Sequence, residues 1–214
     1  MIATTEQNIT LEVLKPEHIV GATRCIVDTF AKGEPMTVAL GITPEEYTYF
    51  AQIFIEKAAV DQMSAVAVDD WGKVVGATIC EDYTSAPPVG IKQISEKFTS
   101  IFQLLESLSE RYTQAYRVVP GSHYHIFMCG VSQSHANLQL GQKLTRFVED
   151  LAREYGYHTL ICEATGRISQ FVTEHQLGFQ HIDEISYQQF QYKNQPVFSS
   201  VDNVKSCAVY HKAL

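Results

Sequence analysis

The chain has 214 residues, of which 45% are hydrophobic and 19% charged, and its formal net charge is -8 at pH 7. This composition is typical of a globular protein long enough to bury a full core, so we expect residues 1–214 to form one domain. Nucleic-acid-binding proteins usually carry a basic patch, and none is evident here, which argues against that class. No apolar run approaches membrane-spanning length, and residues 1–8 lack the basic-then-apolar pattern of a signal peptide. We therefore expect a cytoplasmic protein without membrane partners.

The cysteines support the same compartment. There are five, an odd number, and no C-x-x-C motif occurs. Most lie within apolar runs, so we interpret them as reduced core residues. They are Cys25, Cys80, Cys129, Cys162 and Cys207.

The first half of the chain predicts a strand, two helices and a hairpin. Pro16 opens the first helix, and Gly33-Glu34-Pro35 ends it. Thr43-Pro44-Glu45-Glu46 has the pattern of a capping box with proline at the first helical position. The predicted elements are residues 9–14, 16–31, 43–60, 63–68 and 73–81, the last two joined by the turn 69–72.

The second half predicts a long amphipathic helix, a central strand, a helix, a buried strand, a short helix and two closing strands. The buried strand, 158–163, is apolar on both faces in its middle, which favours a parallel neighbour. We expect it to lie beside the central strand in a mixed sheet. The predicted elements are residues 91–116, 122–131, a helix ending near 155, 158–163, 167–176, 179–187 and 204–212.

The central strand feeds through a polar turn directly into a helix. The first N–H groups of a helix have no internal partners, and the helix dipole adds partial positive charge there. This unit, residues 123–157, therefore predicts a site for a ligand that carries phosphate groups.

This order of elements resembles the GCN5-related N-acetyltransferase (GNAT) family, and within it the dopamine-type arylalkylamine N-acetyltransferases. Three segments carry the resemblance: residues 30–41 with their Glu34-Pro35-Met36, the central unit 131–144, and 163–187 with Leu177-Gly178-Phe179. The resemblance implies an α/β (α+β) fold. Its sheet would be mixed and largely antiparallel, flanked by helices, with a central parallel strand pair splayed for CoA.

One motif departs from the family pattern. The family places Gln/Arg-x-x-Gly-x-Gly/Ala at the phosphate turn, whereas this chain has Ala136-Asn137-Leu138-Gln139-Leu140-Gly141. Only the final glycine is kept. Backbone N–H groups can still hold a pyrophosphate, because they need no particular side chain. We expect the side chain of Gln139 to crowd the closest approach.

The resemblance also implies the residues that bind acetyl-CoA, the cosubstrate. The pantetheine arm would lie between the two splayed strands, and backbone N–H groups of the central strand would polarise the thioester carbonyl. Gly130 indicates either a bulge or close ligand approach there, or simple packing. The expected cofactor-binding residues are Met128, Cys129, Gly130, Val131, Ala136, Asn137, Leu138, Gln139, Leu140, Gly141, Gln142 and Thr165.

Three residues are candidates for catalysis. Glu34 matches the family's Glu-Pro segment and could accept the proton of an ammonium group if its apolar neighbours raise its pKa; alternatively it is a solvated loop acid. Ser169 lies where the subgroup carries a Ser-Gln pair and could protonate the leaving thiolate, or it is a polar residue at a helix start. Tyr187 is another candidate donor, because the family's usual tyrosine position is Glu174 here.

The central strand contains a further set of candidate functional residues. Period-2 alternation places His123, His125 and Cys129 on one face. No carboxylate completes a ligand set, so we expect no metal. His125 could be a substitute base facing the amine or a core histidine. Nothing in the sequence pairs Cys129 or Cys162 with a base, as a nucleophile would require.

The sequence thus predicts an enzyme that moves an acetyl group from acetyl-CoA to a small primary amine by direct attack in a ternary complex, as a monomer or homodimer. The amine pocket would be lined by the two helices after the first strand and by residues 188–203, with aromatics at Tyr47, Tyr49, Phe50, Tyr192 and Phe198. The alternative is a non-catalytic ligand-sensing or protein-interaction module with a degenerate phosphate loop. Acyl transfer to a protein terminus or lysine is a third possibility.

Overall fold

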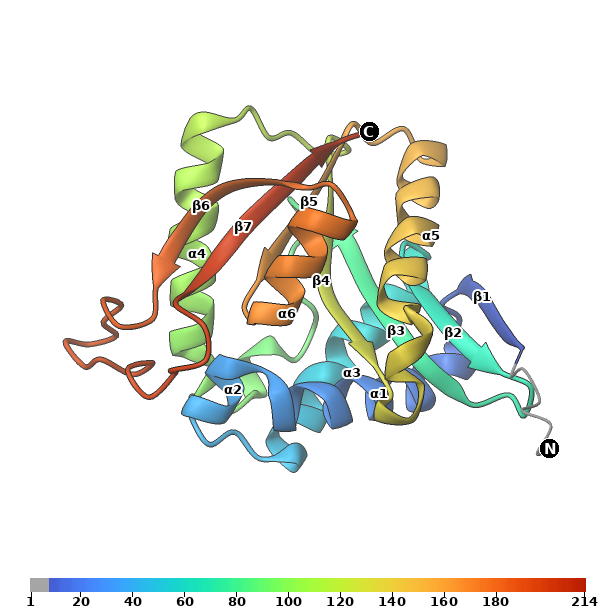
Figure 1. Cartoon of the computed structure of the whole chain (residues 1–214), viewed down its shortest axis with the longest axis horizontal. Helices are drawn as coiled ribbons and strands as arrows, with labels where there is room; N and C mark the ends of the chain where they lie inside the picture. Colours follow the sequence, from blue (N-terminus) through green and yellow to red (C-terminus); the bar gives the residue numbers. More distant parts are fainter. Residues whose placement is uncertain (1–7) are drawn as a thin grey trace.

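The computed structural model describes residues 8–214. Residues 1–7 lie outside the described residues, so the expectation that residues 1–8 form no signal peptide falls almost entirely outside the structure. Figure 1 shows the elements. In chain order they are β1 (Ile9–Val13), η1 (Pro16–His18), α1 (Ile19–Gly33), α2 (Pro35–Ala39), α3 (Pro44–Asp61), β2 (Ala65–Asp69), β3 (Val74–Asp82), η2 (Ile91–Gln93), α4 (Phe98–Ala115), β4 (His123–Val131), η3 (Gln133–Leu138), α5 (Leu140–Glu154), β5 (Thr159–Ala164), α6 (Arg167–Phe171), η4 (Val172–Gln176), β6 (Gln180–Ser186) and β7 (Ser206–Ala213).

The strands form one sheet in the order β1-β2-β3-β4-β5-β7-β6. Every neighbouring pair is antiparallel except β4 and β5, which are parallel. The predicted mixed sheet with a central parallel pair is therefore confirmed. The apolar middle of β5 follows from its position, because a strand with neighbours on both sides and helices over both faces exposes neither face.

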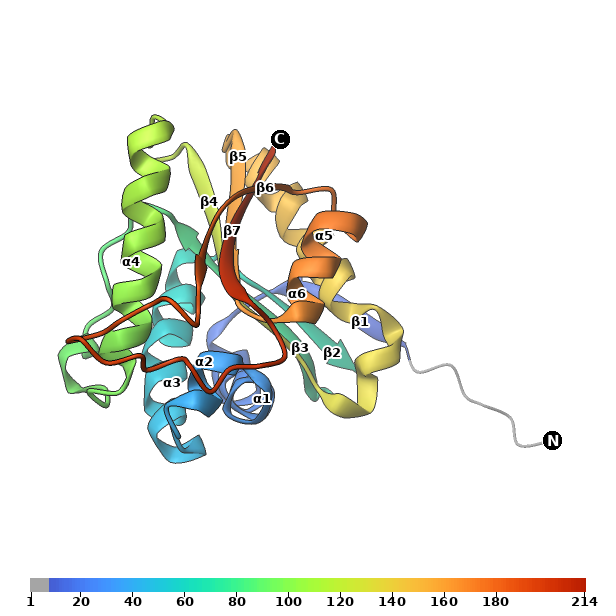
Figure 2. The ribbon, with the colours of Figure 1, turned by 60° about the vertical axis from the view of Figure 1, so that its left-hand side comes forward.

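Helices cover both faces of the sheet. Figure 2 shows α1, α3 and α4 on one side and α5 with α6 on the other. The first side buries a large apolar cluster in which Ile26, Ile55 and Leu104 are fully enclosed, and the second buries Leu144 and Val148 of α5. The two clusters fix the orientation of β4 and β5 between them.

The predicted start of α3 is confirmed. The Thr43 hydroxyl accepts a hydrogen bond from the backbone N–H of Glu46, and the Glu46 carboxylate accepts one from the N–H of Thr43. This reciprocal pair satisfies two N–H groups that the helix itself cannot bond. Pro44 occupies the first helical position, where the missing N–H costs nothing.

The long helix predicted from residue 91 begins later. A short 3₁₀ turn spans Ile91–Gln93, Ile94 is extended, and α4 starts at Phe98. Ser95 and Lys97 donate hydrogen bonds to the Glu46 carboxylate at 2.8 Å each, which ties this segment to the start of α3. Long-range contacts therefore override the helical periodicity of residues 91–97. No helix among residues 8–214 is long and apolar enough to cross a membrane.

Candidate active site

The centre of the sheet opens between β4 and β5. The parallel pairing runs only from His123 and Thr159 to Ile126 and Cys162. Beyond that point β5 continues to pair with β7, whereas the rest of β4 has no strand beside it on this edge within the described chain. The backbone N–H groups of that edge are therefore free to bind a ligand.

A bulge marks the start of the opening. Between β3 and β4 the register passes from Ile79 opposite Met128 to Cys80 opposite Ile126, so Phe127 is the extra residue. A bulge bends its strand and reverses the alternation of side chains after it. A bulge at Gly130 was one interpretation of the sequence, but the bulge lies three positions earlier, at Phe127.

Gly130 itself packs against α1. A Cβ at Gly130 would lie 3.0 Å from the Ile26 side chain and 3.1 Å from the Thr29 hydroxyl. A larger residue would push α1 away from the sheet, so the structure supports the packing interpretation of this glycine.

The bulge also corrects one sequence prediction. His123 and His125 face α4, where the Nε2 atom of His123 lies 3.1 Å from the Tyr112 hydroxyl. Cys129 faces α5 instead, since its Sγ lies 3.9 Å from the position of a Cβ on Gly141. The three side chains do not share a face, because the extra residue Phe127 shifts the period-2 pattern. Burial raises the pKa of the Cys129 thiol, and also that of Cys162, which gives neither the character of a nucleophile.

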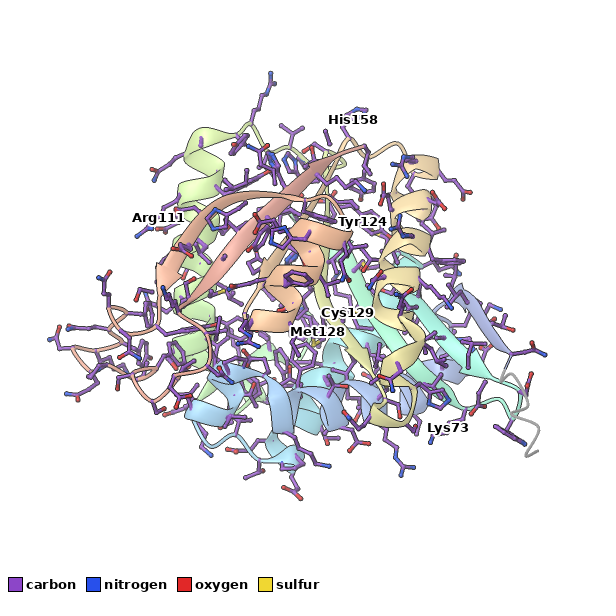
Figure 3. All side chains as sticks on the ribbon, in the orientation of Figure 1. Lys73, Arg111, Tyr124, Met128, Cys129 and His158 are labelled. Atoms are coloured by element: carbon purple, nitrogen blue, oxygen red, sulfur yellow. The ribbon has the colours of Figure 1, made fainter. Side chains whose placement is uncertain are left out.

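A cavity of about 1680 Å³ occupies the opening. Figure 3 places Met128 and Cys129 near the centre of the molecule, and both residues line this cavity. Of the residues expected to bind the cofactor, the cavity wall includes Met128, Cys129, Val131, Gly141 and Thr165. The wall does not include Gly130, Ala136, Asn137, Leu138, Gln139, Leu140 or Gln142. Gly130 faces α1, and the loop residues 136–139 are exposed.

The turn expected to bind phosphate adopts a conformation typical of glycine at Gln139, although glycine is absent there. Gln139 has φ +55° and ψ 28°, the left-handed conformation that glycine adopts most easily, and α5 begins at the next residue. No side chain caps the N-terminus of α5. Its first N–H groups are therefore available to an anion, as binding of a pyrophosphate requires.

Glu34 lies at the junction of α1 and α2, on the cavity wall, and is 9% exposed. Its carboxylate accepts hydrogen bonds from the backbone N–H of Met36 at 3.1 Å and from the N–H and hydroxyl of Thr37, both at 2.6 Å. Glu34 is thus the N-cap of α2 rather than a solvated loop acid. No cationic side chain within residues 8–214 lies within 4.0 Å of it, whereas other buried carboxylates, such as Glu149, are paired.

Aromatic side chains surround Glu34 on the same wall. The phenol of Tyr47 is fully enclosed, and burial raises its pKa, with a smaller contribution from the Glu34 charge. The wall draws on α4 as well as on α1 and α3, a contribution the sequence did not predict. The phenyl and phenol rings on the cavity wall are those of Phe30, Tyr47, Phe50, Phe98, Phe102, Phe127 and Phe179.

The other aromatics expected in the amine pocket lie elsewhere. The wall does not include Tyr49, Tyr192 or Phe198; the Tyr49 hydroxyl lies 2.9 Å from the position of a Cβ on Gly90. Of the 188–203 segment, only Asp202 and Asn203 reach the cavity. Of the segments expected to line an amine pocket, the cavity wall thus includes parts of the two helices and the end of the 188–203 segment.

The two candidate proton donors differ in position. Ser169 lies on the cavity wall, where its hydroxyl donates to the Gly166 carbonyl at 2.8 Å and accepts from the Gly166 N–H at 3.1 Å. Tyr187 is fully buried away from the wall, and its hydroxyl donates to the Thr165 carbonyl at 2.8 Å. Burial raises the pKa of Tyr187, with a smaller contribution from Cys207 and Glu34.

Sequence reasoning did not single out Glu163 of β5, a largely buried acidic residue on the cavity wall. Its side chain is only 8% exposed, and its Oε2 atom lies 2.7 Å from Nε2 of His125. The signal was a charged residue within an otherwise apolar buried strand, since such a charge needs a partner or a ligand.

Comparison with known proteins identifies the class. The model of the acetyltransferase (GNAT) family matches residues 35–179, and the chain belongs to that family. Its members are acetyltransferases, which establishes the chain as an acyl-CoA-dependent N-acetyltransferase by class. No curated protein is matched by the sequence.

Solved structures show the same fold at low sequence identity. The C-terminal condensation domain of Ebony in complex with beta-alanyl-dopamine has a TM-score of 0.87 at 17% identity, over 97% of this chain and 100% of that chain. Arylalkylamine N-acetyltransferase 2 from Aedes aegypti has a TM-score of 0.79 at 22% identity, over 96% and 99%. The Drosophila melanogaster polyamine N-acetyltransferase that forms N-acetylagmatine has a TM-score of 0.74 at 18% identity, over 97% and 100%.

Proposed function

We propose that the chain transfers the acetyl group of acetyl-CoA to a small primary amine within a ternary complex. The main support is Glu34, a buried carboxylate without an ion-pair partner among residues 8–214, on the wall of a cavity that opens at the free edge of β4. An unpaired buried charge is costly, so a cationic group of a ligand would stabilise it.

The residues present fit the cosubstrate. The uncapped N-terminus of α5 offers N–H groups for a pyrophosphate, and the space beside β4 continues from there toward Glu34. When bound, acetyl-CoA supplies an acyl group activated as a thioester. The N–H groups of Met128 to Val131 that point away from β3 would hold the thioester carbonyl oxygen.

Glu34 acts on the amine in this proposal. Its carboxylate binds the ammonium group and accepts a proton from it, directly or through water, which leaves the amine able to attack. The three hydrogen bonds from Met36 and Thr37 fix its orientation toward the cavity. The proton for the departing thiolate would come from Ser169, which lies on the wall, or from Tyr187, whose hydroxyl is buried behind Thr165. Use of Ser169 requires its bond to Gly166 to open.

The solved neighbours support an amine as the acceptor. One is bound to beta-alanyl-dopamine, and another forms N-acetylagmatine. The aromatic wall beside Glu34 would suit an amine with an apolar body.

Calorimetric titration of acetyl-CoA and free CoA, followed by an amine screen, tests the proposal. We expect micromolar binding with a preference for acetyl-CoA, and acetylation that is lost in Glu34→Gln. Absence of CoA binding at high ligand concentration would contradict the proposal and favour the non-catalytic sensing or interaction module.

A further inference from the structure

Besides Glu34, the cavity wall has one other largely buried acidic side chain, Glu163, whose charge is balanced by its neighbours; the remaining acidic residues of the wall, Glu17, Asp28 and Asp202, are exposed. Its Oε2 atom lies 2.7 Å from Nε2 of His125, and Nδ1 of the same ring lies 3.7 Å from Oε1 of Glu81. Glu81 is paired in turn with Lys57 at 3.3 Å. Burial alone would lower the pKa of His125, but the two carboxylates outweigh it and raise the pKa to about 10. His125 is therefore an imidazolium at neutral pH, and Glu163 is its partner.

The two largely buried carboxylates of the cavity, Glu34 and Glu163, consequently suit different ligand groups. Glu34 has no cationic partner in the described chain and would bind an ammonium group. A second ammonium group beside Glu163 would also face the imidazolium of His125, so the repulsion would offset much of the attraction. A neutral hydroxyl donor avoids that repulsion. The Oε1 atom of Glu163 has no hydrogen-bond partner among the described residues and can accept from such a donor.

Aromatic rings connect the two sites. The ring of Phe127 lies 5.7 Å from that of His125 and 6.2 Å from that of Phe50, which belongs to the wall near Glu34. An apolar or aromatic ligand body between the carboxylates would be in contact with rings along its length.

We propose that Glu163 determines substrate specificity by accepting a hydrogen bond from a hydroxyl group on the amine substrate, at the end of its apolar body opposite the amino group. His125 is the positioning residue, because it holds one oxygen of Glu163 and leaves the other toward the cavity. This inference rests on the proposed function. It adds to that function the residue that binds the end of the substrate opposite its amino group.

The test compares two amines that differ by one hydroxyl, 2-phenylethylamine and 4-hydroxyphenylethylamine. The wild-type chain is expected to show at least about tenfold higher kcat/KM for the hydroxylated amine, since a hydrogen bond to a charged acceptor discriminates at that level. Glu163→Leu should bring the ratio close to one, because kcat/KM falls more for the hydroxylated amine than for 2-phenylethylamine. Glu163→Gln, which keeps a weaker acceptor, should give an intermediate ratio, and so should His125→Gln.

Glu149 offers a matched control. Its side chain, on α5, is also 8% exposed and is paired with Arg153 of the same helix and with Lys212 of β7. Glu149→Leu removes a buried ion pair and should lower stability without changing the amine ratio. Binding of acetyl-CoA by each variant confirms that it is folded.

The outcomes separate the inference from the function on which it rests. Equal kcat/KM for the two amines in the wild type, or an equal loss for both in Glu163→Leu, would overturn the inference while acetylation itself stands. A preference for a diamine of the same length would also overturn it. If no amine in the screen is acetylated, the proposed function fails. Calorimetric affinities of the wild type and Glu163→Leu for the same two amines then decide whether Glu163 binds the hydroxyl group.

Discussion

The backbone N–H and the hydroxyl of Thr37 both lie 2.6 Å from the same oxygen of Glu34. This contact gives Glu34 two roles, since one carboxylate caps α2 and lines the cavity. A cap contributes about 0.5–2 kcal/mol to stability. Any loss of activity on mutation of Glu34 must therefore be separated from a loss of structure.

Glu34→Gln and Thr37→Val make that separation. Glu34→Gln should lower kcat/KM for the amine by about 10²- to 10⁴-fold, because a general base is lost, with acetyl-CoA affinity preserved. Thr37→Val removes one donor to the carboxylate and should cost about 1–3 kcal/mol in the free energy of unfolding but less than about tenfold in kcat/KM. Steady-state kinetics and urea denaturation measure both. Parallel losses of activity and stability in the two variants would show that Glu34 is only a cap.

The charge on His125 predicts how stability depends on pH. The pKa of His125 is about 10 in the folded chain against an ordinary value of 6.5, so above pH 6.5 the folded chain holds a proton that the unfolded chain loses. Its contribution to stability is complete below pH 6.5 and disappears as the pH rises through 10. The free energy of unfolding should therefore fall between pH 7 and 8.5.

His125→Gln identifies the source of that fall. The variant should be less stable than the wild type at pH 7, and its free energy of unfolding should change little up to pH 8.5. Burial lowers the pKa values of His123 and His211, so these residues change the free energy of unfolding below pH 6.5 and not between pH 7 and 8.5. The buried cysteines act near and above their ordinary value of 9.0. Urea denaturation of both proteins at four pH values gives the comparison, and equal slopes would refute the assignment.

Local signals in the sequence were sufficient for much of the fold. The capping box at Thr43 depends on four adjacent residues, and the apolar middle of β5 depends only on burial of both its faces, so each could be read directly. The placement of Glu34 at the end of α1 followed from Pro35, which ends one helix and begins the next.

Contacts between distant segments could not be read in this way. The bulge at Phe127 arises from the register of β4 against β3, and it moved Cys129 to the opposite face from His125. The pair of His125 and Glu163 depends on the parallel register of β4 and β5, in which His125 lies opposite Ile161. The part of the cavity wall that α4 supplies likewise follows from packing that no single segment specifies.

The left-handed conformation of Gln139 leads to a last prediction. A residue with a Cβ is sterically strained at φ +55°, whereas glycine is not. Glycine loses more conformational entropy on folding, which offsets part of this advantage. Gln139→Gly should therefore raise the free energy of unfolding by about 0.5–1 kcal/mol. It should also let a pyrophosphate approach the N-terminus of α5 more closely. One improved hydrogen bond is worth about 0.5–1.5 kcal/mol, or about two- to tenfold in CoA affinity.

Gln62 provides the control for this change. It has nearly the same backbone conformation, φ +56° and ψ 23°, at the end of α3, and it does not line the cavity. Gln62→Gly should stabilise the chain as much as Gln139→Gly, because the strain removed is the same, but should leave CoA affinity unchanged. Thermal denaturation and calorimetric titration of CoA into both variants measure the two effects. Equal CoA affinities in the two variants would show that Gln139 does not limit the approach of a phosphate to the N-terminus of α5.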